Sequence, residues 1–172
     1  RQMCIRDRSL GICDTSNLCG ALEFAEKISK SGTQPIIGTQ INFKIHDTTG
    51  LLPLYALNET GYKNIIDLSS ESYLKNDELS DPHITFDYLL NNSEGIALFS
   101  GTVFGLFGKL FVKGKFTEIY DLYNKIKSKF GDRFYIEIQR HKDLNENSFE
   151  KFNLEKSSDL EIPIIATNEV YY

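Results

Sequence analysis

The 172-residue sequence has few cysteines and no long apolar run, and both absences narrow the class of protein. Its three cysteines, Cys4, Cys13 and Cys19, are an odd number without framework spacing, so they predict reduced thiols rather than a disulfide scaffold or a zinc knuckle. No segment reaches the ~18 consecutive apolar residues that a membrane span needs. The amino-terminal arginines are not followed by the apolar core of a signal peptide. We therefore expect a cytoplasmic protein.

An excess of positive charge is also lacking. The chain has 19 Lys and Arg against 24 Asp and Glu, which gives a formal net charge of −5. Binding duplex DNA requires lysines and arginines that replace the counterions of the phosphates. We expect any DNA contact of this protein to lie outside this chain. The 41% hydrophobic and 25% charged residues are typical of a soluble globular protein, and the length fits one domain.

The first eight residues, RQMCIRDR, differ in character from the rest of the chain. They show no periodicity, lead into no strand, and resemble translated adapter sequence at the ends of metagenomic reads. We expect residues 1–8 to be non-native and residues 9–172 to form a partial domain. Because the chain stops at Tyr172 just after a strand pattern, we expect truncation at both ends.

Strand and helix patterns alternate along residues 9–172, which favours an α/β fold with a mainly parallel sheet. PIIGTQINF at 35–43 and PIIATNEVYY at 163–172 echo each other, and each has polar residues at its carboxyl end. In α/β barrels that end carries the functional site. Strands are predicted at 9–13, 35–43, 51–57, 95–100, 134–139 and 162–170, and helices at 18–30, 60–73, 85–90, 116–130 and 149–158.

Spacing alone suggests few candidates for chemistry, and each has a structural alternative. Asp14 could bind a metal or act as a base, but Asp14 or Asn17 could equally cap the helix that follows. His141 could be a ligand at a strand end or a solvated loop residue, and Glu169 a ligand or a surface group. Gln40 has a neutral amide, which is a poor metal ligand. No Ser/His/Asp, Cys/His or HExxH arrangement stands out.

Two further features are interpreted as structural. His46 and His83 lie in polar connectors, which predicts surface residues. The glycine-rich segment 101–108 has neither phosphate-loop nor dinucleotide spacing, so it is interpreted as a loop or a loosely wound start of a helix.

Several segments in order resemble the amino-terminal PHP (polymerase and histidinol phosphatase) domain of bacterial DNA polymerase III alpha subunits. Each match is modest, and the ordered set is specific. The resemblance implies a distorted seven-stranded barrel, incomplete here at its amino terminus, with a site at the carboxyl ends of the strands. The matching segments are CDTSNLCGALEFAEKISKSGTQPIIGTQINF, ALNETGYKNIIDLSSESYL, SEGIALFSG, FGDRFYIEIQRH and IPIIATNEVYY.

In metal-binding members of that family the site holds up to three metals and hydrolyses phosphoesters or proofreads. The resemblance implies that few of the ligands remain in this chain. Asp14 and His141 are kept, and Glu169 preserves the carboxylate of the family's final Asp-x-His. The strand that bears the opening His-x-His of the family is absent.

Four other positions of the family pattern carry poor ligands. Thr15 replaces a histidine, Gln40 a glutamate, Thr102 a cysteine or histidine, and Tyr171 the final histidine. A cluster of cations needs charged and nearly complete coordination. We therefore expect Asp14, Gln40, Thr102, His141, Glu169 and Tyr171 to mark a vestigial site that is free of metal or binds it weakly.

The family resemblance implies a function for the parent protein and another for this segment. The parent would be a DNA-directed DNA polymerase, with Mg²⁺ bound in a polymerase core outside this chain. The segment would need no cofactor and would act as a non-catalytic scaffold that docks the proofreading exonuclease subunit, among the other subunits of the holoenzyme. The alternatives are a stand-alone metal-dependent PHP phosphoesterase, which would need an intact set of ligands, and an isolated binding module.

Overall fold

The structure, a computed structural model, describes residues 8–75 and 81–168. Residues 1–7, most of the segment expected to be non-native, lie outside the described residues, as do 76–80, Glu169 and Tyr171. The strands are β1 (Ser9–Thr15), β2 (Gln34–Ile45), β3 (Thr48–Ala56), β4 (Ile84–Thr85), β5 (Ile96–Phe99), β6 (Phe134–Ile138) and β7 (Ile164–Ala166). The helices are α1 (Ala21–Lys30), α2 (Glu59–Leu74), α3 (Phe86–Asn91), α4 (Leu106–Val112), α5 (Phe116–Phe130) and α6 (Glu146–Leu160).

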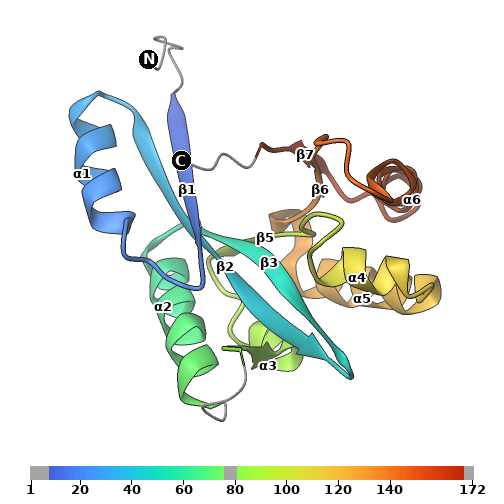
Figure 1. The fold of residues 1–172 in the computed structure, drawn as a ribbon. Coiled ribbons are helices and arrows are strands. Elements are labelled where there is room, and N and C mark those ends of the chain that lie inside the picture. The colour runs from blue at the N-terminus through green and yellow to red at the C-terminus, as the bar shows by residue number, and fades with distance from the viewer. Residues whose placement is uncertain (1–7, 76–80, 169–172) are drawn as a thin grey trace.

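The seven strands form one curled sheet, ordered β1-β2-β3-β5-β6-β7, with β4 paired to β2. β3 runs antiparallel to both of its neighbours, and the other strand pairs are parallel. Helices α1 and α2 lie on one side of the long strands β1 to β3, and α4, α5 and α6 gather on the other side, beside β5 to β7 (Figure 1). This half-barrel confirms the expected α/β class and an incomplete barrel of the PHP type.

The turn that joins β2 to β3 is shorter than the gap between the strands predicted at 35–43 and 51–57. It consists of His46 and Asp47, because Ile45 already pairs with Thr48. His46 has a φ of 50°, which a two-residue turn between twisted strands requires. Lys115 holds this turn from the loop between α4 and α5, since its Nζ lies 3.2 Å from Asp47 Oδ1.

Helix α5 begins and ends where the periodicity predicts. Segment 101–108 was interpreted as a loop or a loosely wound start of a helix, and the second interpretation holds from Leu106, where α4 begins. Gly50 of β3 makes room for this helix, because a Cβ there would lie only 2.5 Å from Leu106 Cα. A glycine therefore permits the two backbones to approach closely.

The core lies between the sheet and α2 to α6. Aliphatic and aromatic side chains from every layer contribute to it, as the hydrophobic effect requires. In the described part of the chain, no helix is long and apolar enough to cross a membrane. The largest fully buried side chains of the core include Phe43, Leu52, Leu54, Phe107, Tyr123, Phe130 and Phe134.

Candidate functional site at the strand ends

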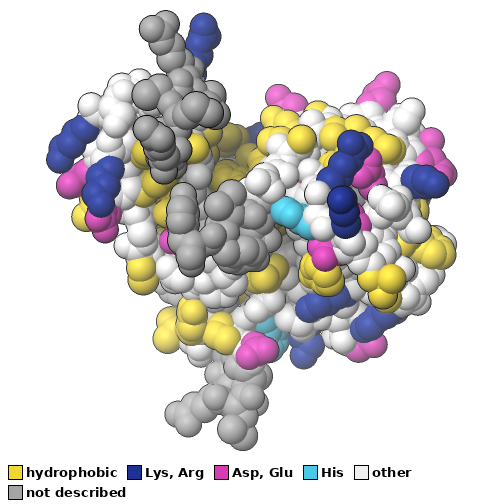
Figure 2. All heavy atoms as spheres, turned by 45° about the horizontal axis from the view of Figure 1, so that its top comes forward, with side chains coloured by type: hydrophobic (Ala, Val, Ile, Leu, Met, Phe, Trp, Pro, Cys, Tyr) yellow, Lys and Arg dark blue, Asp and Glu magenta, His cyan; other side chains and the backbone are white. Residues whose placement is uncertain are grey.

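The ends of several strands open onto one cleft of about 650 Å³. Its polar lining includes Asp14 from β1, Gln40 from β2, Glu137 from β6, and Thr167 just after β7. A smaller adjoining cavity of about 160 Å³ shares Gln40 and Glu137 and adds Thr102. Figure 2 looks onto this end of the molecule, where a hollow with apolar side chains separates the two sides. The fold therefore brings Asp14, Gln40 and Thr102 to one mouth, as the resemblance implies.

The buried carboxylate at this mouth belongs to Glu137, which sequence reasoning did not single out. Glu137 is only 6% exposed. Its Oε1 accepts hydrogen bonds from Thr167 Oγ1 and, at 3.1 Å, from Gln139 Nε2. Gln139 Nε2 also lies 2.9 Å from Thr167 Oγ1, so the three side chains form a closed triangle. A buried carboxylate is costly unless donors satisfy it, and here neutral side chains are the donors.

The Glu137 network continues into the interior through a serine and a tyrosine. The backbone N–H of Glu137 donates to Ser100 Oγ at 2.9 Å. Burial raises the pKa of the Tyr123 phenol, and a hydrogen bond with Ser100 offsets part of this rise. Tyr123 OH also donates to Asn153 Oδ1 at 3.0 Å. The mouth is thus connected by polar contacts to the interface of α5 and α6.

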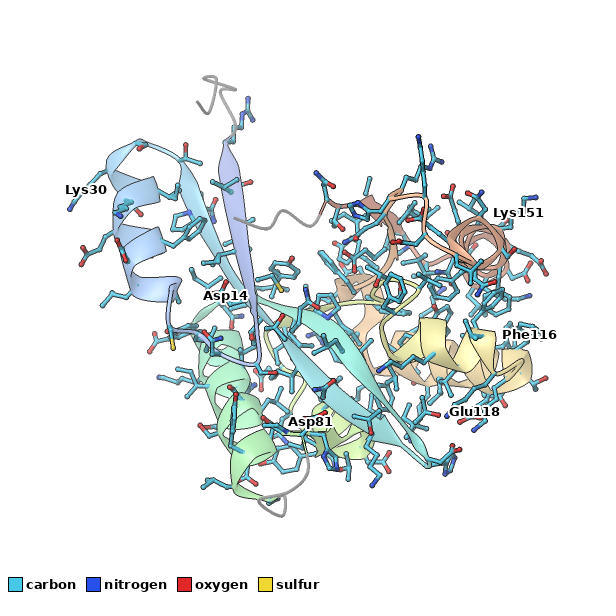
Figure 3. All side chains as sticks on the ribbon, viewed as in Figure 1. Asp14, Lys30, Asp81, Phe116, Glu118 and Lys151 are labelled. Carbon is cyan, nitrogen blue, oxygen red and sulfur yellow. The ribbon has the colours of Figure 1, made fainter. Side chains whose placement is uncertain are left out.

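Asp14 lies at the carboxyl end of β1, half-buried, where it lines the cleft (Figure 3). The alternative interpretation of Asp14 or Asn17 as a helix cap is wrong. Helix α1 begins only at Ala21, after Gly20, and no side chain caps it. Asn17 Oδ1 instead accepts the backbone N–H of Cys19 at 3.0 Å, which closes a local turn before the helix.

His141 is exposed and lies beside the mouth, outside the lining of the cleft. Its Nε2 is 3.1 Å from Gln139 Oε1. Because that amide oxygen can only accept, the proton of this hydrogen bond is on Nε2. Glu146 fixes the loop, since its carboxylate accepts the backbone N–H groups of His141 and Lys142, each at 2.8 Å. The hydrogen bond from the His141 amide is the largest cause that lowers the pKa of Glu146.

The side chains at this mouth do not fit the metal cluster that the resemblance implies. Within residues 8–75 and 81–168, no group of three or more His, Cys, Asp or Glu side chains is arranged to hold a metal ion. Gln40 and Thr102 offer a neutral amide and a neutral hydroxyl, and Glu137 is engaged by Gln139 and Thr167. Metal sites of this kind require several charged or imidazole ligands around one point. Glu169 and Tyr171 lie outside the described residues.

Comparison with known proteins adds a family to this geometry. A family model described as the PHP domain matches residues 7–141. The DNA polymerase III subunit alpha of Caulobacter vibrioides is 36% identical over 94% of this chain and 15% of its own length. That of Rickettsia felis is 38% identical over 94% of this chain and 13% of its own length.

The chain therefore spans about one seventh of these curated relatives. The solved structure of a protein from Bifidobacterium adolescentis, described as a putative metal-dependent phosphoesterase, is 13% identical to this chain. The match covers 92% of this chain and 76% of the solved chain, with a TM-score of 0.36, which is too low to support any conclusion.

Proposed function

This chain belongs to the PHP domain family, and from that premise we propose that it is part of the alpha subunit of a bacterial DNA polymerase III. The curated relatives that carry this name match nearly the whole chain, which supports the proposal. DNA-directed DNA polymerase activity, its Mg²⁺ ions and the contacts with duplex DNA would belong to regions of the parent protein outside this chain. The protein would act in the cytoplasm, as part of the polymerase III holoenzyme.

Within that protein, the role of this domain is that of a non-catalytic scaffold on which the proofreading exonuclease subunit docks. One observation carries this proposal: the buried carboxylate at the mouth, Glu137, is bound by Gln139 and Thr167, where a catalytic site would present it to a cation. The neutral side chains of Gln40 and Thr102 leave too few ligands around it. The oxygen Oε1 of Glu137 already accepts two hydrogen bonds from its own chain, which supports a structural role for this carboxylate.

Metal analysis tests the scaffold proposal. After the purified domain, with its amino-terminal strand restored, is saturated with Zn²⁺ or Mn²⁺ and desalted, we expect well under one metal per chain by elemental mass spectrometry. Gln40→Glu combined with Thr102→His restores ligand types at two positions of the same cavity. This double variant should bind zinc about tenfold more tightly or better. A stoichiometric metal in the unsubstituted domain would refute the scaffold proposal, whatever affinity the double variant has for zinc.

One measurement of activity and one of binding separate the proposed roles. The chain should not hydrolyse p-nitrophenyl phosphate in the presence of Mn²⁺, and hydrolysis would favour the stand-alone phosphoesterase instead. In surface plasmon resonance, the exonuclease subunit encoded in the same genome should bind the immobilised chain. Failure of this subunit to bind the chain, or the full-length parent protein, would refute docking but leave membership of the polymerase untouched.

A further inference from the structure

A second cleft, of about 580 Å³, lies near the turn between β2 and β3, away from the mouth just described. It is bounded by the end of β2, the end of α2, the start of α3 and one face of α5. We call it the basic cleft, after the basic and imidazole side chains that line it: Lys44, His46, Lys75, His83 and Lys125.

Positive charge is concentrated in the basic cleft, although the whole chain carries a net charge of −5. Three lysines and two histidines line it against one carboxylate, Asp87. Asp87 Oδ1 is 2.8 Å from Lys125 Nζ, so this acid is already neutralised by one of the three lysines.

Lys75 is held at the rim of the basic cleft by its neighbours. Its Nζ lies 2.6 Å from Glu71 Oε2, and 4.6 Å from the centre of the Tyr88 ring. These contacts restrain the ammonium group, so less conformational entropy is lost when it meets a ligand.

Lys44 provides the uncompensated charge. Its ammonium group makes no hydrogen bond, ion pair or aromatic contact with the residues that the structure describes, and the side chain is exposed. Across the turn, Glu118 is 3.4 Å from Lys115 and 3.9 Å from His46. Glu71 and Asp87 are engaged by Lys75 and Lys125. Lys44 is left to attract an anion from solution.

We propose that the basic cleft binds a phosphate-bearing anion. Lysine binds phosphate as a point charge, and several lysines and imidazoles from separate segments can surround one such group. Ile45, Phe86 and Leu122 form an apolar wall beside the charges, and Thr85 adds a hydroxyl. The ligand is thus a phosphate carried by a small organic molecule or by a nucleic-acid strand. This site is separate from the mouth and does not depend on the proposed scaffold function.

An NMR titration tests the proposal. Sodium pyrophosphate and, in a second arm, an oligothymidylate are added to the ¹⁵N-labelled chain at low salt. We expect saturable shifts confined to residues 44–46, 83–87 and 125. Lys44→Glu should weaken binding at least about fivefold, because it reverses a charge close to the ligand. Lys30→Glu on α1 and Lys151→Glu on α6 are matched controls, since both lysines lie far from α3 (Figure 3).

Either arm can support the proposal, and the tighter ligand identifies the source of the phosphate. The proposal is overturned if neither pyrophosphate nor the oligonucleotide gives saturable shifts. It is also overturned if the shifts map to other surfaces, or if Lys30→Glu weakens binding as much as Lys44→Glu does. Circular dichroism of each variant shows whether the fold is retained; since all three lysines are exposed, we expect unchanged spectra.

Discussion

Replacing Thr167 by valine tests whether the Glu137 network stabilises the fold. The change keeps the shape of the side chain but removes a hydroxyl that donates to Glu137 Oε1 and lies 2.9 Å from Gln139 Nε2. A hydrogen bond to a charged group contributes ~1.5–3 kcal/mol, and one between neutral groups ~0.5–1.5 kcal/mol. Because Thr167 is only half-buried, water can replace part of both. We expect the free energy of unfolding to fall by about 2 kcal/mol.

Urea unfolding followed by far-ultraviolet circular dichroism measures this loss, since the chain has no tryptophan to report by fluorescence. With a denaturant slope of about 2 kcal/mol per molar, the midpoint should fall by about 1 M. Thr117→Val on the exposed surface of α5 is the control, and it should stay within about 0.5 kcal/mol of the parent. If both variants unfold at the parent's midpoint, the network does not stabilise the fold and the reasoning fails.

Two further predictions concern packing and pH. Gly61→Ala should destabilise the chain by about 2–3 kcal/mol in the same assay. The Cβ of the new alanine would lie 1.8 Å from the carbonyl oxygen of Gly95. A variant as stable as the unsubstituted chain would contradict the close packing of α2. The pKa of Glu146 is lowered from 4.5 in the folded chain, chiefly by the backbone N–H of His141. The ionised carboxylate therefore contributes fully to the free energy of unfolding above pH 4.5, and this contribution is lost as the pH falls through the lowered pKa. Glu146→Gln should therefore lose stability at pH 7 and converge on the unsubstituted chain as the pH falls below the lowered pKa. A difference in stability that is constant with pH would contradict this assignment.

Local periodicity predicted the elements of the fold well where a segment is amphipathic along its whole length. Helix α5 begins and ends at the predicted residues, Phe116 and Phe130. The buried face of α2 does not follow from its predicted range: Ile65 and Leu68 are buried, while Ile66 is 39% exposed. The angle at which a helix meets a sheet depends on partners distant in sequence, and periodicity alone does not define it.

At the mouth, three residues that the family pattern indicates, Asp14, Gln40 and Thr102, line adjoining cavities, but the buried carboxylate between them was not predicted. Glu137 lies in the alternating segment FYIEIQ, where it shares a face with Gln139. That alternation, together with its place near the end of a strand, was the available signal. Thr167, which donates a hydrogen bond to this carboxylate, is 30 residues away in the sequence. The network could therefore be recognised only once the strands were assembled.

The Glu137 network has a consequence for how the strands are joined. Among the described strands, β7 pairs only with β6, through three residue pairs. Glu137 supplements this short pairing, because its carboxylate binds Thr167 just after β7 while its N–H binds Ser100 just after β5. The same residue therefore connects the ends of three strands, which is the kind of structural contribution that the proposed scaffold role requires.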